Sequence, residues 1–205
     1  MPRLAEGAVP RCWRALVDGL ESRPEAKAVH YNLAHFQGAL DDLEHAISVV
    51  GGTSSPAMMQ ELNEYRRKFD ELVRVDASRL KRLGDLEIQD LLGRYRTYLS
   101  DLDELLDPEL RQGEVYSIVS VRDTIESLLR LPEPVRPSGN PIAEILRLDR
   151  RLQEFIARVP WASWVADDYG TGFIEWYAGR FWWWGKVSNA GKHETRGAGG
   201  EPAHP

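Results

Sequence analysis

The spacing of apolar residues constrains the fold of this chain more than any other feature of its sequence. From Pro24 onward, apolar side chains recur alternately three and four residues apart, which is typical of helices that pack along a shared seam. The clearest stretch consists of Val29, Leu33, Phe36, Leu40, Leu43, Ile47 and Val50. It is followed by two glycines, a residue type that suits the end of a helix. We therefore predict a helix that ends near residue 50.

Four more stretches repeat this spacing, and each predicts another helix. They run over residues 58–72, 88–106, 118–128 and 145–159. Ser55 and Pro56 precede the first of them, as a cap and a first helical residue. A shorter helix is expected over residues 11–20. We predict an all-α protein, folded as an elongated antiparallel helical bundle of about five to six helices.

The same pattern divides the chain into three parts. The predicted bundle covers residues 8–160, with a hinge at 132–141, where four prolines cannot continue a helix. Residues 161–188 are rich in aromatic side chains and form a predicted docking segment. Residues 189–205 are rich in glycine and poor in apolar anchors, so we expect a disordered tail.

The docking segment is dominated by the stretch "FIEWYAGRFWWWGKV" at residues 173–187. Its seven aromatic residues are Phe173, Trp176, Tyr177, Phe181, Trp182, Trp183 and Trp184. Three consecutive tryptophans cannot face one direction in a helix or a strand. As a helix, the segment places Trp182 opposite most of the other rings. A hairpin that turns near Gly179 is the alternative, because aromatic residues favour strands.

An aromatic surface of this kind predicts an interaction rather than a reaction. We expect a non-catalytic helical adaptor or structural subunit that binds a protein partner through these seven residues. They are also suited to completing the core of the bundle. A further alternative is an accessory subunit that is attached peripherally to a membrane surface or a membrane complex, because tryptophan and tyrosine favour membrane interfaces.

Motifs for chemistry are sparse. Asp42 and His45 lie three residues apart, as ligands do in carboxylate-bridged di-iron bundles, but the second motif that such a site needs does not occur. The sequence also lacks the glycine-rich phosphate loop, the Gly-x-Ser-x-Gly motif and the His-Glu-x-x-His motif. We assign no catalytic residue, metal ligand or cofactor, and a metal-dependent bundle enzyme is kept only as an alternative.

Charge and cysteine content restrict the partners and the compartment. A net charge of -6 argues against nucleic-acid binding, which depends on clustered Lys and Arg. The single cysteine, Cys12, excludes an internal disulfide and fits the cytoplasm or another reducing compartment. No apolar run approaches the roughly 18 residues of a membrane-spanning helix, so we expect at most a peripheral attachment to a membrane.

Overall fold

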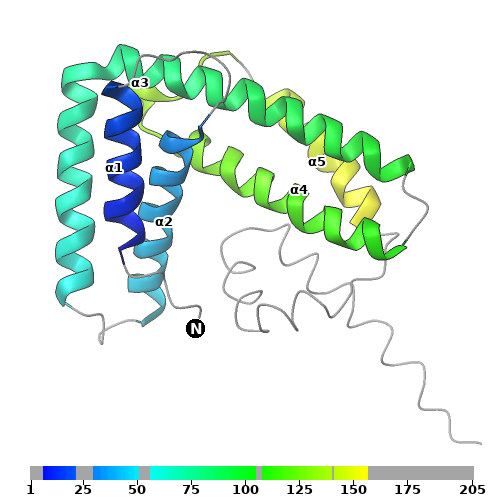
Figure 1. The fold of residues 1–205 in the computed structure, drawn as a ribbon, viewed down its shortest axis with the longest axis horizontal. Helices are drawn as coiled ribbons and strands as arrows, with labels where there is room; N and C mark the ends of the chain where they lie inside the picture. Colours follow the sequence, from blue (N-terminus) through cyan, green and yellow to red (C-terminus); the bar gives the residue numbers. More distant parts are fainter. Residues whose placement is uncertain (1–6, 22–29, 51–55, 105–107, 140, 157–205) are drawn as a thin grey trace, which may run out of the picture. The chain divides into compact units, whose positions relative to one another are not determined.

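The computed structural model describes residues 7–21, 30–50, 56–104, 108–139 and 141–156, and most of these residues are helical, with no strand among them. The elements are α1 (Ala8–Glu21), α2 (Asn32–Val50), α3 (Pro56–Glu104), α4 (Pro108–Leu129), the short 3-10 helix η2 (Glu133–Val135) and α5 (Pro141–Ile156) (Figure 1). The predicted all-α helical bundle is therefore confirmed. The aromatic segment 161–188 and the tail 189–205 lie outside the described residues.

Helix α3 joins two of the apolar stretches that the sequence analysis treats as separate helices. Residues 58–72 and 88–106 were expected on either side of a break, and most of both stretches lies within α3. The backbone leaves helical geometry only at Asp76, with φ of -137° and ψ of 37°. The two arms of α3 run in different directions from this kink (Figure 1).

The chain forms two compact units. Of the described residues, the N-terminal unit contains those up to Tyr95 and those from Ser120 to 139, and the C-terminal unit contains those from Arg96 to Val119 and from Pro141 to Ile156. The chain therefore passes from one unit to the other within α3, within α4 and after residue 140.

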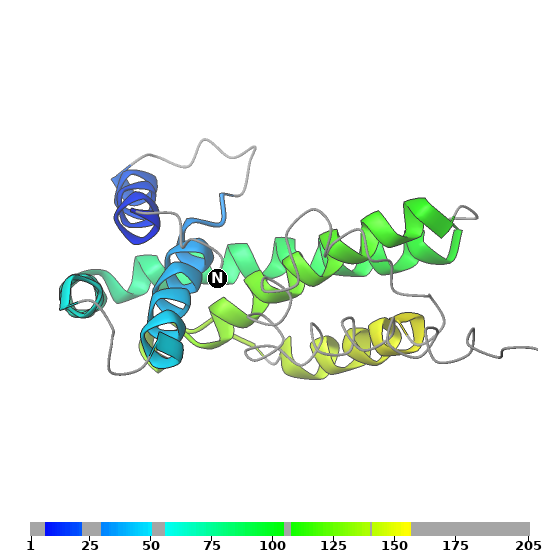
Figure 2. The same cartoon turned by 90° about the horizontal axis from the view of Figure 1, so that it is seen from below.

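A group of aromatic rings joins three helices of the N-terminal unit. Trp13 of α1 lies 5.2 Å from Phe36 of α2 and 6.2 Å from Tyr65 of α3, measured between ring centroids. Phe36 in turn lies 5.3 Å from Phe69 of α3. Tilted ring pairs at these separations are favourable. They hold α1, α2 and the first arm of α3 side by side (Figure 2).

The C-terminal unit buries the apolar positions that the spacing predicted. On α3, α4 and α5, the buried side chains include Leu99, Leu102, Ile118, Ile145, Leu148 and Leu152. Arg96 of α3 and Glu144 of α5 form an ion pair. The predicted helical seams are thus confirmed in this unit as well.

Helices α2 and α4 approach closely at Gly38. A Cβ atom at this residue would lie 3.1 Å from Ser127 Oγ of α4, which is tighter than an ordinary contact. Gly93 of α3 differs, because a Cβ atom there would meet nothing within 4 Å. Gly38 therefore allows α2 and α4 to pack closely. Gly93 has open space around it, so it is a matched control for substitution of Gly38 by alanine.

Gly93→Ala is expected to raise the free energy of unfolding by about 0.5–1 kcal/mol, because alanine favours the helix more than glycine does. Gly38→Ala should gain less, because its methyl group must displace the Ser127 hydroxyl. Urea unfolding of both variants measures the difference. An equal or larger gain at residue 38 would contradict the close approach of α2 and α4.

Candidate functional site

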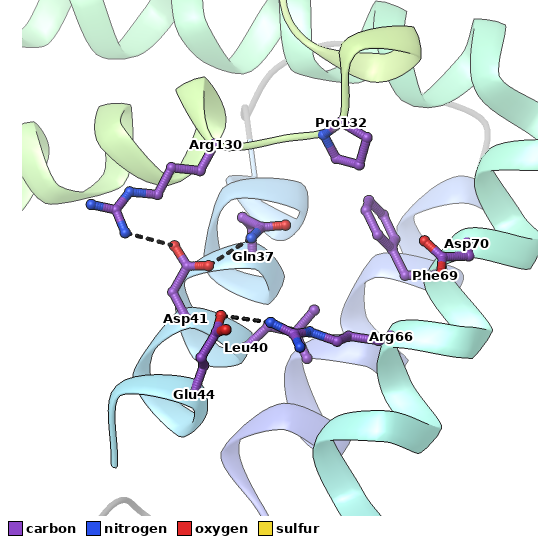
Figure 3. A pocket seen from close by; sticks show the side chains of 9 residues that line it. All are labelled: Gln37, Leu40, Asp41, Glu44, Arg66, Phe69, Asp70, Arg130 and Pro132. Carbon is purple, nitrogen blue, oxygen red and sulfur yellow. Dashed lines mark hydrogen bonds and ion pairs between the residues drawn. The ribbon is translucent and has the colours of Figure 1, made fainter. Parts of the chain in front are cut away.

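A pocket of about 380 Å³ opens in the N-terminal unit between α2, α3 and the turn that follows α4 (Figure 3). Its apolar lining comes from Leu40, Phe69 and Pro132, of which Leu40 and Phe69 are buried. Charged side chains line the rest of it, namely Asp41, Glu44, Arg66, Asp70 and Arg130. A volume of this size is within the range of sites for small ligands or single side chains.

Asp41 is the best-anchored acid of the pocket. Its carboxylate accepts a hydrogen bond of 2.7 Å from Gln37 Nε2 and forms an ion pair with Arg130 Nη1 at 3.9 Å. The Asp41 side chain is only 11% exposed. Arg130 also reaches Glu126 Oε1, at 3.4 Å from its Nε. Asp41 therefore connects α2 to the C-terminal end of α4.

A second ion pair connects α2 to α3 at the outer side of the pocket. Arg66 Nη2 lies 2.6 Å from Glu44 Oε2, and the two side chains are 47% and 55% exposed. Solvent screens such a pair, so its contribution to stability is small. Figure 3 shows both arginines directed at carboxylates of α2.

The composition of the pocket suits recognition of a polar group. Its lining consists of carboxylates, guanidinium groups, one amide and apolar side chains. Two pairs of opposite charges, Asp41 with Arg130 and Glu44 with Arg66, join neighbouring elements. The pocket thus offers hydrogen bonds and charge for binding.

A second polar centre lies where α2 begins, at Glu87 of α3. The Glu87 side chain is 0% exposed. Its two carboxyl oxygens accept hydrogen bonds from the backbone N–H groups of Leu33, at 3.0 Å, and Ala34, at 2.9 Å. Burial raises the pKa of Glu87 to about 7, although the two N–H donors act in the opposite direction.

Tyr31, the residue directly before α2, holds the start of this helix to α3 as well. Its hydroxyl donates a hydrogen bond to Asp90 of α3. Arg94 Nε also donates to Asp90, at 2.9 Å, and the Arg94 guanidinium lies 5.3 Å from the centroid of the Tyr31 ring. Burial, with the Asp90 hydrogen bond, raises the pKa of Tyr31 to about 12. The hydrogen bond from Tyr31 is also the main cause that lowers the pKa of Asp90.

The sequence analysis and the structure single out different residues. All seven predicted partner-binding residues, from Phe173 to Trp184, lie outside the described part of the chain. Asp42 and His45 are both described and partly exposed. Within the described ranges, no three His, Cys, Asp or Glu residues gather into a group that could hold a metal ion.

The sequence analysis did not single out Glu87, although the spacing around it indicates a buried carboxylate. Leu80, Gly84, Glu87 and Leu91 keep the alternating spacing of four and three, which places a carboxylate on an apolar seam. The pocket gave no such signal, because its residues come from three distant stretches of the chain.

Comparison with protein-family models, with curated proteins and with solved structures finds no match to this chain. None of the described helices combines the length and the apolar character needed to cross a membrane. The function is therefore argued from the residues themselves.

The two acids of α2 in the pocket should differ in their effect on stability. Asp41→Ala is expected to lower the free energy of unfolding by about 1–3 kcal/mol, because it removes a largely buried acceptor from Gln37 and Arg130. Glu44→Ala should lower it by less than about 1 kcal/mol, because the pair with Arg66 is exposed. Chemical denaturation at low and high salt tests this, and a larger effect at residue 44 would contradict it.

Proposed function

We propose that this protein is a non-catalytic helical adaptor or structural subunit that binds a protein partner through the aromatic residues between Phe173 and Trp184. One observation carries the proposal. Of the seven tryptophans, all except Trp13 lie between Trp161 and Trp184. Tryptophan and tyrosine are enriched at protein interfaces, where a few such residues supply most of the binding energy.

The described helices support this proposal in a second way. Helix α5, the last described element before the aromatic segment, buries Ile145 and Leu148 but exposes two other large apolar side chains. These are Ile142, 55% exposed, and Leu146, 57% exposed, which lie one helical turn apart. Apolar side chains grouped on a surface are typical of interaction sites.

The pocket is also consistent with a binding role. Four of its charged groups form ion pairs between neighbouring elements, Glu44 with Arg66 and Asp41 with Arg130, so part of its charge joins the helices. The metal-dependent alternative gains no support within the described residues, where no cluster of possible ligands occurs.

Single substitutions in the tryptophan run test the proposal. Trp182→Ala is expected to weaken partner affinity by about 2 kcal/mol or more, as at an interface hot spot, and to leave the melting temperature nearly unchanged. The partner is first identified by affinity purification in mild detergent with mass spectrometry, and its affinity is then measured by calorimetry. Trp13→Ala is the control, because Trp13 packs against Phe36 and its loss should lower the melting temperature.

Two other outcomes would contradict a protein-binding role. If alanine at residues 182, 183 and 184 lowers the melting temperature equally, the aromatic segment belongs to the core. If the wild-type chain floats with liposomes, and Trp183→Ala and Trp184→Ala abolish this flotation, the chain binds a membrane surface instead.

A further inference from the structure

The pocket of the N-terminal unit contains one more carboxylate than it contains guanidinium groups. Its acids are Asp41, Glu44 and Asp70, and its arginines are Arg66 and Arg130. Arg66 pairs with Glu44, and Arg130 pairs with Asp41. Because the two charges of an ion pair largely cancel each other at a distance, the charge that a ligand meets in this pocket comes mainly from Asp70.

The carboxylate of Asp70 is open to a ligand. Asp70 is an exposed residue of the pocket lining. Arg74, one helical turn later, donates a hydrogen bond of 3.3 Å to the backbone carbonyl oxygen of Asp70 and not to its carboxylate. Within the described residues this carboxylate has neither an ion pair nor a hydrogen bond (Figure 3). Its oxygen atoms are therefore available as acceptors.

Gln37 of α2 supplies a second acceptor. Its Nε2 donates a hydrogen bond of 2.7 Å to Asp41. Because a carboxylate accepts, the nitrogen of the amide must face Asp41 and the amide oxygen must face the other way. Figure 3 shows this oxygen directed away from Asp41, on the side of the pocket where Phe69 is drawn. No donor from the described part of the chain reaches it. The pocket thus presents open acceptors on two different helices.

The apolar part of the lining suits an alkyl chain. Phe69 and Leu40 are 3% and 5% exposed, so the core holds them in place, and Pro132 of the turn after α4 completes this surface. In the view of Figure 3 the Phe69 ring is seen between Gln37 and Asp70. Methylene groups gain free energy when they leave water for such a surface. A volume of about 380 Å³ has room for a short chain with a polar group at each end.

We propose that this pocket binds an alkylammonium chain. The ammonium group pairs with Asp70, and the methylene groups pack against Leu40, Phe69 and Pro132. The oxygen of Gln37 accepts a second N–H group at the other end of the ligand. An ammonium group has one positive charge and three N–H donors without an acceptor, so it matches a surplus carboxylate. This inference does not rest on partner binding through the aromatic segment.

Two sources share this chemistry. The side chain of a lysine in a polypeptide has the ammonium group at one end and the backbone N–H group at the other. A free aliphatic diamine has an ammonium group at both ends. Either ligand supplies the positive charge, the methylene groups and the second donor that the pocket lacks, so the experiment compares them.

The ion pairs of the pocket argue against an anionic ligand. An anion would have to displace Glu44 from Arg66, which it contacts at 2.6 Å, or compete with the acids that hold Arg130. Those acids are Asp41 and Glu126. The net charge of -6 also repels anions from the protein as a whole.

NMR titration of the full-length protein with N-acetyl-lysine methylamide tests the pocket. We expect shifts of the amide resonances of pocket residues and a dissociation constant in the millimolar range, because few ligand atoms make contact. N-acetyl-norleucine methylamide has a similar chain without the ammonium group. It should bind about tenfold more weakly, as expected when a charged hydrogen-bond donor is lost. Tighter binding of cadaverine than of the lysine amide would assign the pocket to free diamines, and the reverse would assign it to a lysine of a polypeptide.

Two variants separate the pocket from the general attraction of an acidic protein for cations. Asp70→Asn should weaken binding of the lysine amide about tenfold, because it removes the charged acceptor. Glu71→Gln is the matched control. It removes the same charge from the next residue, which is 61% exposed, pairs with Arg67 and lies outside the pocket lining. Its affinity should stay nearly unchanged, and both variants should keep the melting temperature of the wild type, because both side chains are exposed.

Three results would overturn the proposal. If neither amine shifts the resonances of pocket residues, the pocket does not take an alkylammonium chain. Equal affinities for the lysine and norleucine amides would show that only the apolar surface binds. An equal loss of affinity in Asp70→Asn and Glu71→Gln would assign the binding to the net charge of the protein.

Discussion

The two hydrogen bonds between Glu87 and the backbone of Leu33 and Ala34 fix the point on α3 at which α2 begins. Because a helix is a rigid rod with a constant rise, this point determines where each later turn of α2 lies. Phe36 then meets Trp13 and Phe69, and Asp41 and Glu44 reach Arg130 and Arg66. The aromatic cluster and the charged pocket of the N-terminal unit both depend on this starting position.

A leucine at residue 87 would avoid the cost of burying a carboxyl, but it would leave the N–H groups of Leu33 and Ala34 without an acceptor. Unpaired buried donors are costly, so neither residue is free of penalty at this position. Leucine and glutamate at residue 87 differ in how strictly they fix the position of α2 along α3. Apolar side chains tolerate a helix that slides by part of a turn, whereas two N–H groups reach two carboxyl oxygens in one arrangement only. The two hydrogen bonds of Glu87 therefore define one register between α2 and α3.

The fold class could be predicted because apolar spacing reports directly on which face of a helix is buried. Leu33, Phe36 and Leu40 were placed on a seam from spacing alone, and all three are buried. The kink at Asp76 could not be predicted, because neither a proline nor a glycine marks it. The pocket could not be predicted either, since spacing gives the buried face of each helix but not which helix faces it. Arg66, Arg130 and Asp41 meet through tertiary packing, and no local pattern connects them.

The N-terminal unit pairs two acids of its pocket with arginines, whereas helix α5 leaves part of its apolar surface exposed within the described residues. In the pocket, Asp41 and Glu44 are matched by arginines of neighbouring elements, and the largely buried Asp41 contributes more to the stability of the N-terminal unit than the exposed Glu44 does. Helix α5 differs, because it buries only part of its apolar face. Ile145, Leu148 and Leu152 are buried, whereas Ile142 and Leu146 remain more than half exposed. At 100° per residue these two side chains lie at the edge of the same apolar face that the buried ones form. Helix α5 therefore buries only part of its apolar face within the described residues, and the edge near its N-terminal end stays open.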